Sequence, residues 1–132
     1  MLFVNKPNYP RALLFGQWYR NEIDSQGNEH LEYALFSRDG SFEFTFITLD
    51  NKGKLLEQVT ELGDWGLVAG IHFTFTKDEV IHEQLFSADL NNDDNYHAYH
   101  VITLDHKTFC YQHALTKEEY VMRRVVDSAG HC

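Results

Sequence analysis

Apolar and polar residues alternate along most of the chain, in short stretches rich in Phe, Tyr, Val, Ile and Thr. A period of two is typical of strands that bury one face. Turn-forming residues separate the stretches, and Asp39-Gly40 is the strongest signal because a type I′ turn needs positive φ at both central positions. The pattern predicts nine strands, over residues 13–23, 30–38, 41–49, 54–62, 65–76, 79–87, 95–105, 108–115 and 119–126.

Nine short strands, joined mainly by tight turns, favour a sheet that closes on itself, because closure removes the exposed strand edges. We therefore expect an all-β fold, a single antiparallel up-and-down β-barrel of about nine strands. The barrel domain would span residues 13–126. It would lie between an N-terminal extension of residues 1–12 and a C-terminal tail of residues 127–132.

The predicted turns fix which side chains face the barrel interior, because register decides the face of every residue. A turn at Asp39-Gly40 places Tyr33 opposite Phe46, with both inside. Turns at residues 63–64, 77–78 and 106–107 continue this inner face. Its polar members are then Tyr33, Gln58, Thr60, His82, Gln84, His100, Tyr111, His113, Tyr120 and Arg124, whereas Glu57 and Glu61 fall on the outer face. Buried polar groups cost about 1–3 kcal/mol each when unpaired, so this interior implies a mutual network, trapped water or a ligand.

Histidines are the residues of this interior best suited to chemistry. The turn at residues 106–107 sets His100 opposite His113, which would bring their Cβ atoms about 4.5–5.5 Å apart. His82 falls level with His100 if Ser87 pairs with Asn95, and three imidazoles on one rung suit zinc or iron. Ligand recognition and acid–base work are alternatives, and hydrogen bonding within the barrel is the interpretation that we favour. We therefore expect no metal, no cofactor and no catalytic residue.

Charge and composition exclude several classes of partner. The formal charge of −9, from 11 basic and 20 acidic side chains, argues against nucleic acid, which needs clustered Lys and Arg. No apolar run approaches the roughly 18 residues of a membrane helix, and the first residues do not read as a signal peptide. Two cysteines, Cys110 and Cys132, make no disulfide framework. We expect a cytoplasmic protein that binds neither nucleic acid nor membrane.

Gly16-Gln17-Trp18 opens the first predicted strand, and Arg124 lies in the last. This combination resembles the calycin superfamily of lipocalin-like β-barrels. There, a Gly-x-Trp begins the first strand and an arginine from the closing strand packs across the indole. The resemblance implies that Arg124 covers Trp18 through a cation–π contact. The alternative is that Arg124 binds the carboxylate of a ligand.

Lipocalin-like barrels carry small ligands, so the resemblance implies a protein that binds a small, partly apolar molecule inside the barrel. The expected binding residues are Tyr33, Gln58, Trp65, His82, Gln84, His100, Tyr111, His113 and Arg124. Two alternatives stay open. One is a non-catalytic interaction domain with a filled barrel, which includes a homodimer. The other is a small barrel enzyme with His100 or His113 as proton carrier, although we expect a binding protein rather than an enzyme.

Overall fold

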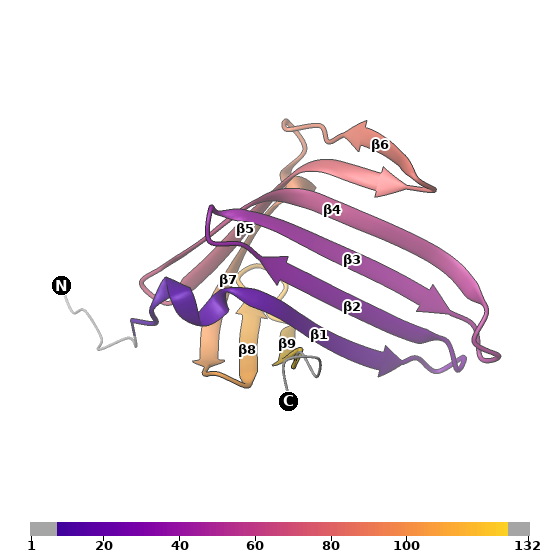
Figure 1. Ribbon diagram of the computed structural model, residues 1–132, viewed down its shortest axis with the longest axis horizontal. Helices are drawn as coiled ribbons and strands as arrows, with labels where there is room; N and C mark the ends of the chain where they lie inside the picture. The colour runs from indigo at the N-terminus through magenta and orange to yellow at the C-terminus, as the bar shows by residue number, and fades with distance from the viewer. Residues whose placement is uncertain (1–7, 127–132) are drawn as a thin grey trace, which may run out of the picture.

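The computed structural model describes residues 8–126, which form nine antiparallel strands and two short 3-10 helices (Figure 1). The strands are β1 (Gly16–Ile23), β2 (Glu29–Phe36), β3 (Ser41–Leu49), β4 (Leu55–Val68), β5 (Ile71–Ile81), β6 (Gln84–Ser87), β7 (Tyr96–Leu104), β8 (Thr108–His113) and β9 (Glu119–Arg124). The 3-10 helices are η1 (Arg11–Leu14) and η2 (Asp93–Asn95). The predicted tail at residues 127–132, and residues 1–7 of the predicted extension, lie outside the described residues.

Eight of the described strands close into a barrel. Their order is β4-β3-β2-β1-β9-β8-β7-β5, and β5 pairs again with β4. β6 pairs only with β5 and lies outside the barrel, as the hairpin at the top of Figure 1 shows. The prediction of one antiparallel barrel is confirmed, although β6 takes no part in its closure.

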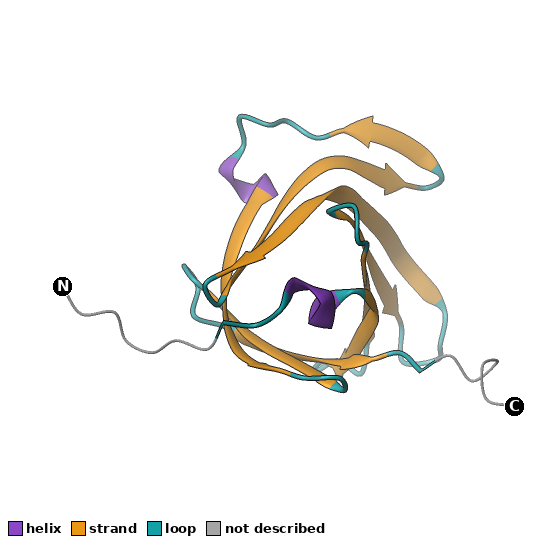
Figure 2. Ribbon diagram, turned by 60° about the vertical axis from the view of Figure 1, so that its left-hand side comes forward, coloured by secondary structure: helices purple, strands orange, loops and turns teal. Residues whose placement is uncertain are grey.

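Helix η1 lies across one end of the barrel (Figure 2). Leu14, its last residue, and Trp18 of β1 are both fully buried, and the Trp18 indole donates a hydrogen bond of 2.9 Å to the Leu14 carbonyl. The Arg124 guanidinium carbon lies 4.3 Å from the centre of the Trp18 ring. The expectation from the resemblance, that Arg124 covers the Trp18 indole, is confirmed.

The Arg124 guanidinium also holds the backbone around η1. It donates hydrogen bonds to the carbonyls of Phe15 at 2.6 Å and His106 at 2.7 Å, and a further one to that of Leu13. Gly16 allows this close approach, because a Cβ there would lie 3.0 Å from Arg124 Nη1 and the backbone has a φ of 111°. One side chain thus ties η1, the start of β1 and the β7–β8 turn together.

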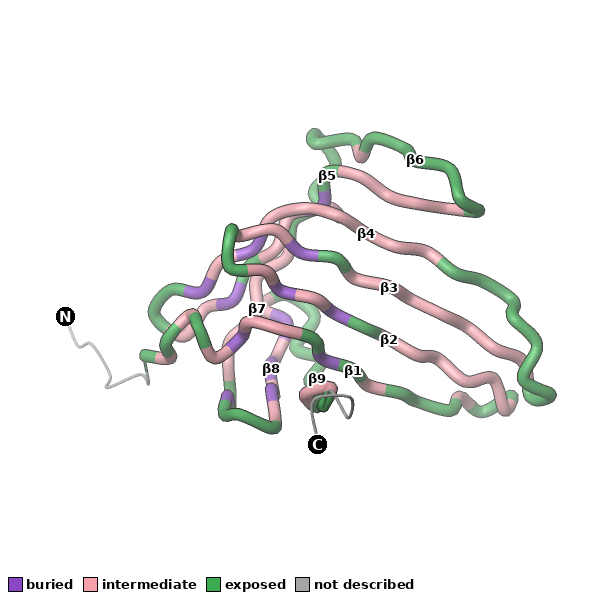
Figure 3. Tube along the Cα trace, viewed as in Figure 1, coloured by how far each residue is buried: buried purple, intermediate pink, exposed green. Residues whose placement is uncertain are grey.

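Buried side chains gather in the half of the barrel next to η1, whereas the far ends of β1 to β4 are partly or fully exposed (Figure 3). The core consists of Leu14, Trp18, Ala34, Phe36, Phe42, Trp65, Leu67, Leu104, Phe109, Tyr111 and Met122. The barrel is therefore filled and capped at one end, and any internal space must lie towards the other.

The predicted register of the β2–β3 hairpin is wrong by one residue. The Ser37 amide donates to the Ser41 carbonyl, which closes a three-residue turn with Gly40 at a φ of 92° instead of a two-residue turn. Because side chains alternate between faces, this shift turns the whole strand over. Tyr33 therefore faces outward and is 43% exposed, while Glu32, opposite Phe46, faces the interior.

The predicted turns at residues 63–64 and 77–78 are also wrong, because β4 and β5 run through them. The turns lie instead at Ala69-Gly70, with φ values of 53° and 76°, and at His82-Glu83, with φ values of 50° and 63°. His82 and Gln84 consequently lie in or next to an exposed turn outside the barrel. The new pairing also reverses which side chains of this part of β4 face the interior. Gln58, expected inside, is on the outside, and Glu61, expected outside, is on the inside.

The predicted β7–β8 turn is nearly right, since Leu104 pairs with Phe109 as expected. However, a bulge between Val101 and Thr103 shifts the rest of the ladder by one residue. Tyr99, rather than His100, therefore lies opposite His113, and His100 faces outward.

Arg124→Ala should lower the free energy of unfolding by about 3 kcal/mol, because it removes charged hydrogen bonds to three carbonyls and the contact with the indole. Urea unfolding followed by tryptophan fluorescence measures the loss. Arg123→Ala is the matched control, since Arg123 is exposed and faces away from the interior, and its change should stay within about 0.5 kcal/mol. Equal losses for the two variants would contradict this role of Arg124.

Candidate functional site

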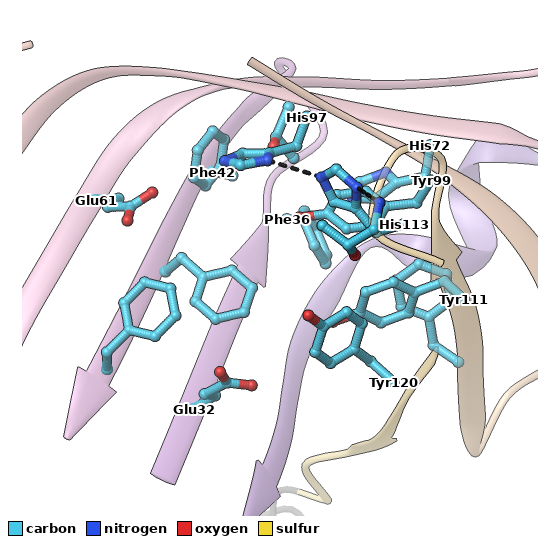
Figure 4. A pocket seen from close by; sticks show the side chains of 15 residues that line it. Glu32, Phe36, Phe42, Glu61, His72, His97, Tyr99, Tyr111, His113 and Tyr120 are labelled. Atoms are coloured by element: carbon cyan, nitrogen blue, oxygen red, sulfur yellow. Dashed lines mark hydrogen bonds between the residues drawn. The ribbon is translucent and has the colours of Figure 1, made fainter. Parts of the chain in front are cut away.

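The barrel contains a cavity of about 270 Å³ beside the core (Figure 4). Most of its wall is aromatic, from Phe36, Phe42, Phe44, Phe46, Tyr99, Phe109, Tyr111 and Tyr120. On one side the rings of Phe44 and Phe46 stack at 4.7 Å between centroids. On the other side Tyr111 stacks between Phe109, at 4.4 Å, and Tyr120, at 5.3 Å. The cavity is thus bounded by two stacked aromatic walls.

Two histidines on this wall are joined by a hydrogen bond of 3.1 Å, from His113 Nε2 to His97 Nδ1 (Figure 4). His113 Nδ1 accepts the backbone N–H groups of Leu115 at 3.1 Å and Thr116 at 3.2 Å, so this nitrogen carries no proton. The His113 proton is therefore on Nε2 and is donated to His97, whose own proton lies on Nε2. Burial, and secondarily the neighbouring His97, lowers the pKa of His113 and favours this neutral arrangement.

His72 is the most deeply buried histidine of the site, at 2% exposure. Its Nδ1 lies 3.2 Å from the Gly66 carbonyl, which can only accept, so Nδ1 carries the proton and Nε2 is a bare acceptor. Burial lowers the pKa of His72 to about 4, and the bond to Gly66 offsets this only in part. The ring is enclosed by Phe36, Tyr99 and Phe109, at 5.1 to 5.7 Å between centroids.

Several polar atoms of the cavity wall have no hydrogen-bond partner in residues 8–126. They include His72 Nε2, His97 Nε2 and the hydroxyls of Thr74, Tyr99 and Tyr111. Among the same residues, no fully buried side-chain nitrogen or oxygen lacks a partner. The unpartnered atoms of His72 and Tyr111, which are only 2% and 5% exposed, must therefore be reached from the cavity that they line.

Two carboxylates lie on the wall, Glu32 from β2 and Glu61 from β4 (Figure 4). Glu32 pairs with Arg20, whose guanidinium also lies 5.1 Å from the centre of the Tyr120 ring. Glu61 accepts a hydrogen bond of 2.9 Å from the Thr76 hydroxyl. Burial raises the pKa of Glu61, and this hydrogen bond opposes the rise.

The structure brings only part of the predicted site together. Tyr111 and His113 line the cavity, Trp65 lies in the core next to it, and Arg124 belongs to the capped end. Tyr33, Gln58, His82, Gln84 and His100 do not line it. Gln58 and His82 instead line an outer groove together with Leu55 and Leu56.

The trio His82, His100 and His113, considered for a metal, is therefore not assembled. Within the described part of the chain, no group of three or more His, Cys, Asp or Glu side chains is arranged to hold a metal ion. The same part of the chain has no helix with the length and hydropathy needed to span a membrane.

Sequence reasoning missed Glu32, Glu61, His72, His97 and Tyr99 as site residues. The signal for His97 and Tyr99 was present, since the two alternate on one face of a strand. Their face depended on a bulge that no residue in the sequence marks. The carboxylates were assigned to the outside because the assumed turns placed them on the face opposite the mainly apolar one.

No family model matches the chain, and no curated protein matches it in sequence. A structural match was found to a lipocalin-like protein from Bacteroides uniformis ATCC 8492, with a TM-score of 0.51 and 18% sequence identity. The match covers 86% of this chain and 99% of that chain. Together with the closed antiparallel barrel, it shows that this chain has a lipocalin-like β-barrel fold.

The buried neutral His72 should make the protein less stable in acid. Its pKa of about 4 lies below the ordinary 6.5, so between these values the unfolded chain binds a proton that the folded chain does not. Stability therefore falls as the pH falls, by about 2 kcal/mol from His72 alone between pH 6.5 and 5. Urea unfolding at pH 7 and pH 5 should show that His72→Phe loses about 2 kcal/mol less than the parent protein. An equal loss in both proteins would contradict a neutral, buried His72.

Proposed function

We propose that this lipocalin-like barrel binds one small, partly apolar organic molecule in its cavity. The observation that carries the proposal is the set of unpartnered polar atoms in an aromatic cavity, above all His72 Nε2 and the Tyr111 hydroxyl. Both atoms are reached from the cavity, since no fully buried side-chain nitrogen or oxygen in residues 8–126 lacks a partner. A ligand with matching donor and acceptor groups would bond to them while its apolar body contacts the rings.

The size of the cavity limits the ligand. Sites for drug-sized molecules usually measure about 300–1,000 Å³. A cavity of about 270 Å³ lies just below this range and suits a molecule built around a single ring or a short chain. Its volume also favours ligand binding over the alternative of a filled barrel that works only through its surface.

The histidine tautomers favour binding over acid–base catalysis. A general base needs an accessible unprotonated nitrogen. In His97 and His113 both unprotonated nitrogens already accept hydrogen bonds, from His113 and from the backbone. His72 does offer a free nitrogen, but with a pKa of about 4 it is a weak base. These groups are suited to orienting a ligand.

We place this binding protein in the cytoplasm as part of the same proposal. The low cysteine content, with no disulfide framework, supports that location.

Titration with benzyl alcohol, an uncharged probe with a single ring, tests the proposal. We expect saturable chemical-shift changes in the 15N-labelled full chain that fit a one-to-one stoichiometry. Thr74→Trp places a large side chain in the cavity wall and should weaken binding at least tenfold. The control is Thr103→Trp on the exposed outer face of β7, which should leave the affinity unchanged. A probe that does not bind, or that binds Thr74→Trp as well as the parent protein, would refute the cavity as a binding site.

A further inference from the structure

We infer that the ligand of this cavity carries a positively charged amine, which Glu61 binds beside the face of Phe44. This inference rests on the proposed function and specifies the chemical class of its ligand. Four features of the cavity carry it: the charges on the wall, the different partners of the two carboxylates, the aromatic surface next to Glu61, and the polar atoms at the buried end.

The wall carries negative charge only. Its charged side chains are Glu32 and Glu61, and no lysine or arginine is among the residues that line it. The histidines His72 and His113 are kept neutral by their lowered pKa values. A carboxylate or phosphate on a ligand would therefore meet repulsion without a partner, whereas a cation would meet attraction.

The two carboxylates differ in what already neutralises them. Glu32 pairs with Arg20, so its charge is compensated within the protein. Glu61 has only the neutral Thr76 hydroxyl as a hydrogen-bond partner, and in residues 8–126 it makes no salt bridge. Glu79, its neighbour across β4 and β5, adds a second negative charge and raises the pKa of Glu61 further. Glu61 is therefore the carboxylate that lacks a cation.

An aromatic surface accompanies this carboxylate. Glu61 pairs directly with Phe44 across β3 and β4, a position that places the Cβ atoms about 4.5–5.5 Å apart. Phe44 in turn stacks on Phe46. An ammonium group bound to Glu61 would also lie near the negative faces of these rings, and such cation–π contacts strengthen when water is excluded.

The buried end of the cavity defines what the other end of the ligand must match. Tyr111 and His72 are more than nine-tenths buried and present an unpartnered hydroxyl and an unpartnered acceptor nitrogen to the cavity. The aromatic body of the ligand would fill the space between these atoms and Glu61. An arylalkyl amine, with a donor group on the ring to satisfy His72 Nε2, matches all of these groups.

Three compounds that share a phenylethyl body separate the charge of the ligand from its apolar part. They are 2-phenylethylamine, which is cationic, 2-phenylethanol, which is neutral, and 3-phenylpropanoate, which is anionic. Binding is measured at pH 8 by chemical-shift titration of the 15N-labelled full chain. We expect the amine to bind at least tenfold more tightly than the alcohol, and the carboxylate to bind most weakly, because an ionised donor makes a stronger hydrogen bond to a carboxylate than a neutral donor does.

Glu61→Gln removes the charge and retains an oxygen that can accept the Thr76 hydrogen bond. It should reduce the affinity for the amine about tenfold and leave that for the alcohol within about twofold. The control is Glu43→Gln, because Glu43 lies on β3 but is exposed on the outer face. This variant should bind all three compounds as the parent protein does.

The outcomes distinguish this inference from the proposed function. Equal affinities for amine and alcohol, tighter binding of the carboxylate, or an amine affinity unaffected by Glu61→Gln would each overturn the inference. If the uncharged benzyl alcohol probe still binds in the cavity, the proposed function would stand without this inference. If neither the probe nor any of the three compounds binds, both would fail.

Discussion

The first and last strands of the barrel pair over only two residues, Trp18 with Arg124 and Tyr19 with Arg123. This short seam closes the barrel, and the contact of Arg124 with the Trp18 indole lies within it. The same guanidinium binds carbonyls before β1 and in the β7–β8 turn. Closure of the sheet, the position of η1 and the filling of one barrel end therefore depend on one arginine. The cavity exists because only that end is filled.

The fold was predictable because its signals are either local or repeated. Alternating apolar residues recur in every strand, and Gly16, Trp18 and Arg124 form a pattern whose geometry the structure reproduces. Individual turns were less predictable. Gly63-Asp64 has the composition of a turn, yet Gly63 lies inside β4, at a position that only glycine fits because a Cβ there would come within 2.0 Å of the Phe75 carbonyl oxygen. Conversely, His82-Glu83 forms a turn with positive φ angles although neither residue is glycine.

The candidate site was predicted only in part. A register error of one residue moves a side chain to the other face of the sheet, whereas an error of two or four residues keeps it on the same face. Tyr111 was expected on the inner face and lies there, opposite Tyr120. A shift of one residue exchanged Tyr33 for Glu32, and the bulge in β7 exchanged His100 for its neighbours. As a result, Glu32 faces the interior where Tyr33 was expected, and His97 and Tyr99 face it where His100 was expected. The chemistry of a barrel interior therefore depends on turn lengths and bulges, which are weakly encoded in the sequence.

The polar groups of the cavity are arranged in two ways, and the difference explains what the barrel can do. Some are satisfied within the protein: His113 by two backbone amides and His97, and Glu32 by Arg20. These contacts fix the orientation of the wall. Others, such as His72 Nε2 and the Tyr111 hydroxyl, sit on tightly packed rings and have no hydrogen-bond partner in residues 8–126. Because these rings pack against the core, the positions of both polar atoms on the cavity wall are fixed. Fixed hydrogen-bonding groups discriminate between molecules by their chemistry, whereas a merely apolar wall would discriminate by size alone.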